Sequence, residues 1–218
     1  MKYGKSLYNQ IEGAFPEWKD HFLSYKDLKK KLKSMEGISN EQFDFIMLLD
    51  AEVDKFNDFF LEKQQDYVII IWELKERVGR ANESSEELAK IRNAIVNFHG
   101  EMVLLQNYSA FNFIGLVKIL KKYDKRTGAV MRLPFIQKVL QQPFFTMDLL
   151  YDLIKQCEDL LDRLFPSVQS RDRDEPSNPK YMENIYMRSV VSAIRILKEI
   201  RSESSTRSDY SLPPFSKP

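Results

Sequence analysis

Apolar residues recur at every third or fourth position along two long stretches of this 218-residue chain, 41–79 and about 85–125. That spacing places apolar side chains on one face of an α-helix. No glycine or proline falls between positions 38 and 78, so the first stretch predicts one uninterrupted helix of about ten turns. The segment SSEE, which begins at Ser84, supplies capping residues for the second stretch. We therefore predict two long helices at the centre of the molecule.

Two shorter helices are predicted ahead of the long pair. A helix over 3–13 ends at Gly13 and Pro16, and a second helix is expected over about 17–35, where apolar residues again have helical spacing. Together these two helices predict a hairpin over about 1–36.

The chain beyond the long helices is built from shorter elements. Pro134 opens a short helix over 133–142, which Pro143 ends, and an amphipathic helix is expected over 146–164. No alternating strand pattern with hairpin turns is present, so the fold class is predicted to be all-α. The predicted organisation is one domain over 1–165 (hairpin about 1–36, long-helix bundle about 40–126, short helices 130–165), a flexible loop 166–180, a C-terminal helix 181–201 and a disordered tail 202–218.

The inventory of reactive side chains is small. The chain holds one cysteine and two histidines, and it lacks a glycine-rich phosphate loop and the G-x-S-x-G, H-E-x-x-H and C-x-x-C patterns. We expect no metal site, a half-buried thiol at Cys157 and a packed, hydrogen-bonded imidazole at His99. An enzyme is therefore the weaker hypothesis.

Membrane and secretory signals are weak as well. The longest unbroken apolar run, Val68 to Trp72, is far shorter than the roughly 20 residues that span a bilayer. The first ten residues contain no apolar core of a secretory signal. We expect a soluble, intracellular chain.

Charge is strongly segregated although the whole chain carries a net charge of only +1. Residues 1–33 hold eight lysines and four acidic residues, a net charge of +4, and residues 111–126 hold five basic residues and one acidic residue, also +4. The intervening 34–110 carries seven basic and fifteen acidic residues, a net charge of −8. If the fold brings the two basic segments together, they form a concentrated positive surface. The alternative is two solvated helix faces that never meet.

Each basic segment arranges its lysines in one stripe. Spacings of 3, 4 and 7 residues place four ammonium groups within about 100° of the helix circumference. Like charges at that spacing repel each other, so a polyanion would relieve the repulsion. Tyr25 lies beside the first stripe and can donate a hydrogen bond to an anion. The two stripes are Lys26, Lys29, Lys30 and Lys33, and Lys118, Lys121, Lys122 and Lys125.

Lysine dominates these stripes and arginine is nearly absent from them. Duplex recognition usually uses arginine forks or interleaved aromatic residues over a wider surface, and a membrane surface requires large apolar side chains beside the basic ones. A small, densely charged polyphosphate fits the two compact stripes better, because lysine binds phosphate as a point charge.

Several segments carry a family resemblance. Parts of the chain resemble the three blocks of an SPX domain. The first block resembles MKYGKSLYNQ together with PEWKDHFLSYKDLKKKLK, the second DAEVDKFNDFF, and the third NFHGEMVLLQNYSAFNFIGLVKILKKYDKRTG. RLPFIQKVLQQPFF and YMRSVVSAIRILKEIRSESST resemble the plant stand-alone members of that family. The resemblance implies a helical fold that binds inositol pyrophosphates or inositol hexakisphosphate, with no further cofactor.

The resemblance also implies which residues bind the ligand. It places a phosphate-binding cluster on Tyr25, Lys29 and Lys122, and a lysine surface cluster on Lys118, Lys121 and Lys125. Lys2 is a further expected contact beside the N-terminus of the first helix, where anions are favoured.

The function implied by the resemblance is not enzymatic. The liganded protein is expected to capture a MYB-type phosphate-starvation transcription factor and keep it off DNA, in the nucleus and cytoplasm. Direct binding to nucleic acid or membrane is not expected. The alternative is an enzyme that metabolises polyphosphate or inositol phosphate, or an accessory subunit of one.

Overall fold

A computed structural model describes residues 3–36, 39–81 and 85–164 of the chain, and the described part is helical without any strand. The all-α prediction is confirmed. The predicted loop 166–180, helix 181–201 and tail 202–218 lie outside the described residues. The elements are α1 Tyr3–Ala14, the 3-10 helix η1 Pro16–His21, α2 Tyr25–Ser34, α3 Ser39–Arg80, α4 Ser85–Thr127, α5 Arg132–Val139, α6 Pro143–Thr146 and α7 Asp148–Leu164.

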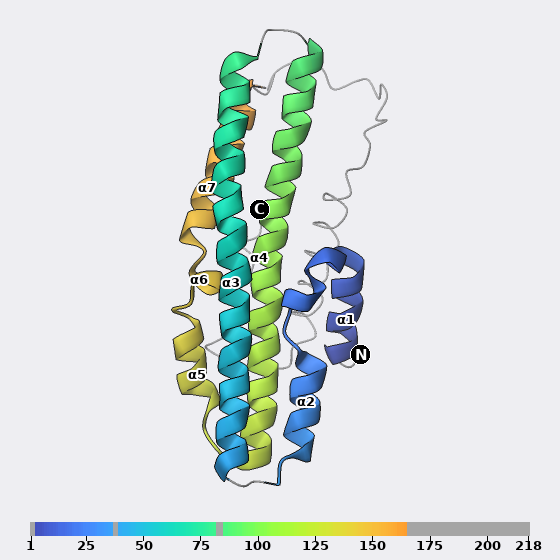
Figure 1. The fold of residues 1–218 in the computed structure, drawn as a ribbon, viewed down its shortest axis with the longest axis vertical. Helices are drawn as coiled ribbons and strands as arrows, with labels where there is room; N and C mark the ends of the chain where they lie inside the picture. Colours follow the sequence, from blue (N-terminus) through green and yellow to red (C-terminus); the bar gives the residue numbers. More distant parts are fainter. Residues whose placement is uncertain (1–2, 37–38, 82–84, 165–218) are drawn as a thin grey trace, which may run out of the picture.

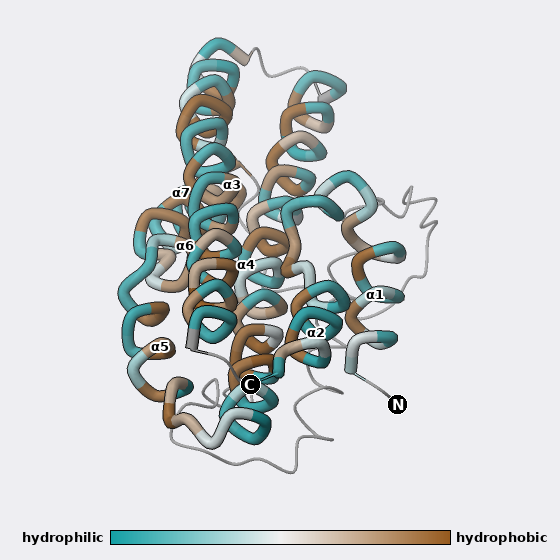
Figure 2. The backbone as a smooth tube through the Cα atoms, turned by 60° about the horizontal axis from the view of Figure 1, so that its bottom comes forward, coloured by the Kyte–Doolittle hydropathy of each residue, from teal (hydrophilic) through white to brown (hydrophobic). Residues whose placement is uncertain are grey.

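Two long antiparallel helices, α3 and α4, form the axis of the molecule (Figure 1). Helix α2 packs against both of them near the end where α3 begins and α4 ends, and α1 packs beside η1 and α2. Helices α5, α6 and α7 follow the other side of the long pair. Hydrophobic residues recur turn after turn along α3 and α4 (Figure 2), so the predicted periodicity of both long helices is confirmed.

Helix α4 is the core helix of the bundle. By length and composition it could cross a membrane, since an 18-residue window in it has a mean hydropathy of 1.3. However, 67% of that window is buried inside the protein. The apolar residues of α4 are therefore used in packing against the surrounding helices.

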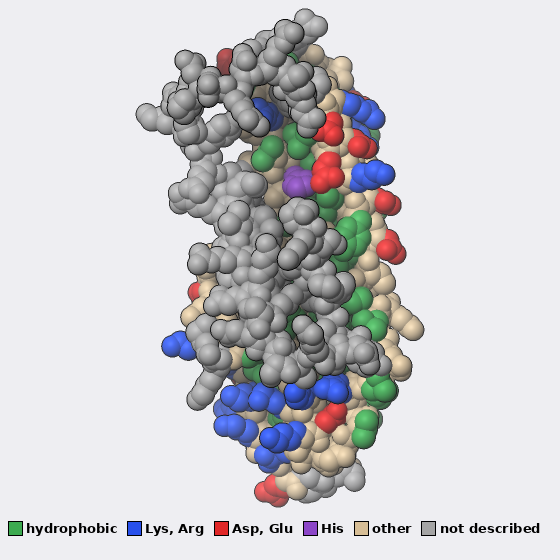
Figure 3. All heavy atoms as spheres, turned by 180° about the vertical axis from the view of Figure 1, so that it is seen from behind, with side chains coloured by type: hydrophobic (Ala, Val, Ile, Leu, Met, Phe, Trp, Pro, Cys, Tyr) green, Lys and Arg blue, Asp and Glu red, His purple; other side chains and the backbone are tan. Residues whose placement is uncertain are grey.

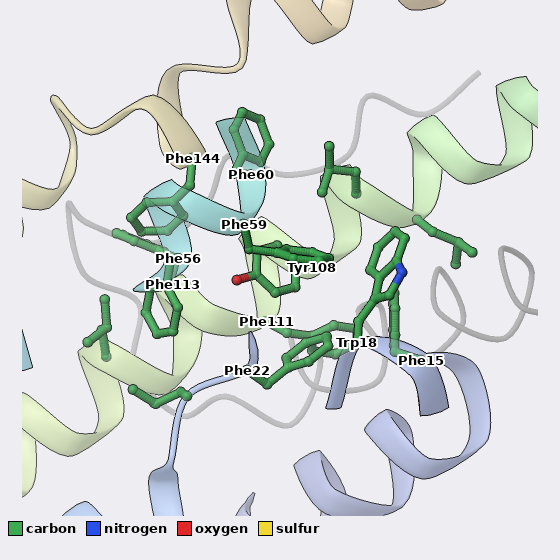
Figure 4. Packing of buried hydrophobic residues seen from close by; sticks show 14 of the residues in the cluster. Phe15, Trp18, Phe22, Phe56, Phe59, Phe60, Tyr108, Phe111, Phe113 and Phe144 are labelled. Atoms are coloured by element: carbon green, nitrogen blue, oxygen red, sulfur yellow. The ribbon is translucent and has the colours of Figure 1, made fainter. Parts of the chain in front are cut away.

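An aromatic cluster joins the N-terminal elements to the long helices (Figure 4). Tyr108 of α4 lies at its centre, fully buried, and its hydroxyl donates a 2.9 Å hydrogen bond to the carbonyl of His21. Ring pairs whose centroids lie within about 7 Å add to the stabilisation that burial provides. The rings within 6.5 Å of Tyr108, measured between centroids, are Trp18, Phe22, Phe56 and Phe59.

The prediction of one continuous helix over about 17–35 is wrong. The chain forms the short 3-10 helix η1, and then extends at Phe22, whose φ and ψ are −78° and 162°, before α2 begins. The predicted hairpin therefore consists of α1, η1 and α2.

Side chains of the long helices cause this break. The backbone N–H of Leu23 donates to Oδ1 of Asn112 at 2.9 Å, and that of Ser24 donates to Oε2 of Glu52 at 2.9 Å. Glu52 is itself held by Lys55, with Nζ 2.8 Å from Oε2. These bonds satisfy backbone donors that a continuous helix would have bonded internally.

The C-terminal part of the described chain differs from expectation in two details. The helix predicted over 133–142 ends at Val139, and Pro143 begins the short helix α6 instead of only ending its predecessor. Cys157 is fully buried, not half-buried, and burial raises the pKa of its thiol to about 12. The helix predicted over 146–164 is confirmed as α7.

Gly115 allows α4 to approach the break before α2, and its replacement should be destabilising. A Cβ at Gly115 would lie 2.5 Å from Cδ2 of Leu23. We expect Gly115→Ala to lower the unfolding free energy by about 1–2 kcal/mol, because overpacking outweighs the better helix propensity of alanine. Gly79→Ala is the matched control, since a Cβ there meets nothing within 4 Å. Chemical denaturation of both variants checks this, and equal stability changes would contradict it.

Candidate polyanion-binding site

Helices α2 and α4 lie side by side and run in the same direction, which aligns the two lysine stripes. Just before α2 begins, Leu23 is bonded to Asn112, and in the last turn of α2 the carbonyl of Lys33 accepts a hydrogen bond from Nη2 of Arg126 at 2.9 Å. The partners are 89 and 93 positions apart in sequence. Residues about 90 positions apart are therefore level on the two helices, and the spacing between Lys29 and Lys122 is 93.

The stripes form one positively charged region near the end of the long pair. Figure 3 shows Lys and Arg side chains gathered toward that end of the molecule. Lys29 and Lys118 are half-buried, whereas Lys121, Lys122 and Lys125 are exposed. None of these five lysines takes part in an ion pair within the described part of the chain. Their charge is therefore available to an anion.

Tyr25 lies at the inner edge of this region. Its side chain is buried, and burial raises the pKa of its phenol. The hydroxyl therefore stays protonated over the physiological range and can act as a hydrogen-bond donor. Gly4 of α1 lies against the ring, since a Cβ at Gly4 would be 3.2 Å from Cδ1 of Tyr25.

A cavity of about 220 Å³ opens beside Tyr25 between α1 and α2. Two of its lining residues are in contact, because Nζ of Lys26 lies 3.9 Å from the centroid of the Tyr8 ring. The cavity is lined by Gly4, Lys5, Tyr8, Tyr25, Lys26 and Lys29. The site thus includes a wall from α1 as well as the two lysine stripes.

The site residues predicted from the sequence did not include the lining residues of α1. Gly4, Lys5 and Tyr8 were missed, and Lys26 was assigned to a stripe but not to the site. The available signal is the spacing of Gly4, Lys5 and Tyr8, which share one side of α1 within about one turn. Lys2, the remaining predicted contact, lies outside the described residues.

Tyr3 connects α1 to both α2 and α4. Its ring packs edge-to-face on Tyr25 with centroids 5.0 Å apart, and its hydroxyl donates to the carbonyl of Phe111 at 3.4 Å. Nζ of Lys118 lies 5.2 Å from the Tyr3 ring centroid, a cation–π distance. The position of α1 is therefore coupled to a lysine of the second stripe.

The ammonium group of Lys118 is affected both by burial and by the neighbouring lysines. Its pKa is lowered first by burial and then by the charges of Lys121 and Lys122. A lysine whose pKa is lowered in the folded state makes the protein more stable as pH rises through that pKa toward the unfolded value. A bound polyanion counteracts the positive charges of Lys121 and Lys122 and so favours the charged form of Lys118.

We predict that the Lys118 ammonium loses its proton at a lower pH than an ordinary lysine and that Lys121→Gln raises its pKa. Removing one neighbouring positive charge removes part of the repulsion. Addition of a polyanion should raise the Lys118 pKa further in the unmodified chain. NMR titration of the lysine side chains, assigned with Lys118→Gln, measures these shifts. An unchanged Lys118 pKa in Lys121→Gln would disprove the electrostatic coupling.

Other reactive groups lie apart from this region. His99 is half-buried, with Nε2 3.3 Å from Oε1 of Glu158, as expected of a packed, hydrogen-bonded histidine. Within residues 3–36, 39–81 and 85–164, no group of three or more His, Cys, Asp and Glu side chains could hold a metal ion. The lysines and Tyr25 of the site offer electrostatic binding with hydrogen-bond donation.

Comparison with known proteins assigns the fold and the family. The SPX domain family model matches residues 1–42 and 79–139. The SPX domain of glycerophosphodiester phosphodiesterase 1 from Chaetomium thermophilum, solved in complex with inositol hexakisphosphate, has a TM-score of 0.66. It is 24% identical, and the match covers 75% of this chain and 99% of that one. This likeness confirms the helical fold.

Plant proteins are much more similar in sequence. SPX domain-containing protein 2 of Arabidopsis thaliana is 52% identical, and SPX domain-containing protein 1 of the same species is 54% identical. SPX domain-containing protein 1 of Oryza sativa subsp. japonica is 52% identical. Each match covers 99% of this chain and 92% of the relative. This chain therefore belongs to the SPX domain family and is similar to its plant stand-alone members over almost their whole length.

Proposed function

We propose that this protein is a sensor of cellular phosphate status that binds inositol pyrophosphates or inositol hexakisphosphate in the region around Tyr25, Lys29 and Lys122. The observation that carries the proposal is the alignment of the two lysine stripes on α2 and α4 beside the buried Tyr25. Several phosphate groups on one small ring match several ammonium groups on one small surface. The SPX domain from Chaetomium thermophilum was solved in complex with inositol hexakisphosphate, which supports this ligand class.

The proposed output is binding to another protein, not catalysis. When liganded, the protein captures a MYB-type phosphate-starvation transcription factor and keeps it off DNA, in the nucleus and cytoplasm. Its plant relatives carry the name of SPX domain-containing proteins and not of an enzyme. A lysine and tyrosine site holds and orients phosphate groups but supplies no pair of carboxylates for acid–base chemistry.

Helix α1 is the element that we propose to respond to the ligand. It has 12 residues, and a helix of that length is marginal in water without tertiary contacts. Its contacts to Tyr25 and Lys118 place it where a bound polyanion acts on both lysine stripes. A ligand that binds the ordered form of α1 more tightly shifts the population toward it, and this form offers a surface to the partner.

Hydrogen exchange should report this ordering. We expect the amides of α1 to become more protected when inositol hexakisphosphate is added, while the amides in the middle of α3 and α4 change little. Phosphate groups neutralise the repulsion between the stripes and so stabilise the packing of α1 against Tyr25 and Lys118. Intact ligand binding with equal α1 exchange in both states would place the responsive element elsewhere.

The proposed function is tested by capture of nuclear proteins on the full-length chain with and without an inositol pyrophosphate. The expected result is ligand-dependent retention of a MYB-type transcription factor and recovery of the inositol pyrophosphate unchanged. Loss of a phosphate group from the ligand would support the enzyme alternative. Binding of any DNA duplex with a steep salt dependence would indicate direct nucleic-acid binding instead.

A further inference from the structure

The outer face of α3 carries an apolar stripe that no described element covers. Leu61, Val68, Ile69 and Trp72 are all exposed, Ile69 to 57% and Trp72 to 62%. At 100° per residue the four positions fall within about 100° of the helix circumference. We call this set the apolar stripe. Exposed apolar residues gathered on one face of a helix mark an interaction site more often than scattered single residues do.

Acidic side chains lie along one side of the apolar stripe and at the end where α3 begins. They are all exposed and occur along the same part of α3. Their charge favours an occupant that is apolar on one side and basic on the other. The acidic residues of this set are Asp54, Asp58, Glu62, Asp66 and Glu73.

A segment of the same chain has these properties. Residues 181–201, for which the sequence predicts a helix, contain four basic and two acidic residues, a net charge of +2. Tyr186, Val190, Ile194 and Leu197 recur at spacings of three and four and give that helix an apolar face. The segment is therefore complementary to the apolar stripe in both hydrophobicity and charge.

The covalent connection can reach the apolar stripe. Nζ of Lys75 in α3 donates to Oε1 of Gln156 in α7 at 2.6 Å, so α7 lies beside α3 only three residues beyond Trp72. From Gln156, the last described turns of α7 extend about 12 Å to Leu164. The 16 residues 165–180 span up to about 50 Å when extended. The linker therefore allows the helix to dock on its own chain.

We propose that residues 181–201 form an amphipathic helix that docks on the apolar stripe of α3 in the same chain. Tyr186, Val190, Ile194 and Leu197 face the stripe. Lys198 and Arg201, at the flank and the C-terminal end of that face, are the basic residues nearest the acidic side chains. The docked helix covers the hydrophobic surface of α3 and adds a further helix to the bundle.

The docking site is remote from the lysine region. Phe45 stacks on Tyr123 with ring centroids 5.2 Å apart, so residue 45 of α3 is level with the lysine-bearing end of α4. Trp72 lies 27 residues further along α3, about 40 Å away at the rise of an α-helix. Docking is therefore independent of the proposed ligand, and the two proposals can fail separately.

A spin label on the full-length chain tests this proposal. Ser192→Cys places the label on the side of the segment opposite Val190 and Ile194, and Cys157 is buried and does not compete for the reagent. We expect the label to reduce the intensity of the Trp72 indole N–H signal, which Trp72→Phe identifies. A label on Val130→Cys, at an exposed position after the lysine-bearing end of α4, is the control and should leave that signal intact.

Two further samples exclude other occupants. Val190→Asp with Ile194→Asp should restore the Trp72 signal in the labelled Ser192→Cys chain, because the apolar face of the segment is lost. A mixture of isotope-labelled chain without spin label and unlabelled chain with it should show an unaffected signal. A Trp72 signal that the label leaves intact overturns the proposal. A signal reduced equally in the mixture overturns it too, by showing that a second copy covers the stripe.

Discussion

Lys122→Ala should weaken binding of inositol hexakisphosphate about ten- to a hundredfold without destabilising the free protein. A charge-assisted contact to phosphate is worth about 1.5–3 kcal/mol, which corresponds to that loss of affinity. The exposed Lys122 side chain has no ion pair in the described structure and helps to lower the pKa of Lys118. Its removal therefore relieves repulsion, and the unfolding free energy of the free protein should hold or rise slightly. Calorimetric titration and chemical denaturation measure the two effects.

Lys90→Ala is the matched control for this prediction. Lys90 is also an exposed lysine of α4, but it pairs with Glu86 near the opposite end of the helix. We expect it to leave the affinity unchanged. Affinity of the unmodified chain should fall steeply with salt, because screening acts on every lysine contact, and the dependence should be shallower for Lys122→Ala. Equal affinities of Lys122→Ala and the unmodified chain would remove Lys122 from the site.

The long helices were predictable because their signal is local. Apolar periodicity without an interrupting glycine or proline was enough to predict α3 Ser39–Arg80 to within two residues of the expected 41–79. The break before α2 was not predictable in this way. The groups that take up the backbone N–H of Ser24 and Leu23 lie 28 and 89 positions away in sequence, and no local pattern marks them.

The same distinction applies to the site. Each lysine stripe was predictable from residue spacing alone, since both lie within a single helix. Their alignment depends on the packing of α2 against α4. The lining residues from α1 were missed because Gly4 and Tyr8 carry no charge and Lys5 belongs to neither lysine stripe. The place of Gly4 and Tyr8 in the site follows from tertiary contacts with Tyr25 and Lys26.

Asn112 links the core of α4 to the start of α2 through one hydrogen bond. Its side chain is fully buried in α4, and Oδ1 accepts the backbone N–H of Leu23 at 2.9 Å. Leu23 precedes Tyr25 by two residues. The bond therefore fixes the position at which α2 begins and, with it, the placement of Tyr25 and Lys29.

Asn112→Leu should lower both stability and ligand affinity. Leucine has a similar size but no acceptor, which leaves the N–H of Leu23 buried and unpaired at a cost of about 1–3 kcal/mol. The start of α2 should then shift or fray, so we expect faster hydrogen exchange at Leu23 and Ser24. Affinity for inositol hexakisphosphate should fall because Tyr25 and Lys29 are no longer held in place. Denaturation, hydrogen exchange and calorimetry on the same sample measure all three effects.

Asn107→Leu is the control that separates loss of the bond between Asn112 and Leu23 from the general effect of replacing a buried asparagine on stability. Asn107 is also buried in α4, but its Nδ2 donates to the carbonyl of Val103 within the same helix at 2.8 Å. No other element depends on that bond, so we expect a stability change within about 1 kcal/mol and an unchanged affinity. If the two leucine variants lose affinity equally, the bond to Leu23 does not position the site. If only Asn112→Leu loses affinity, the packing of α2 on α4 controls the geometry of the phosphate-binding residues.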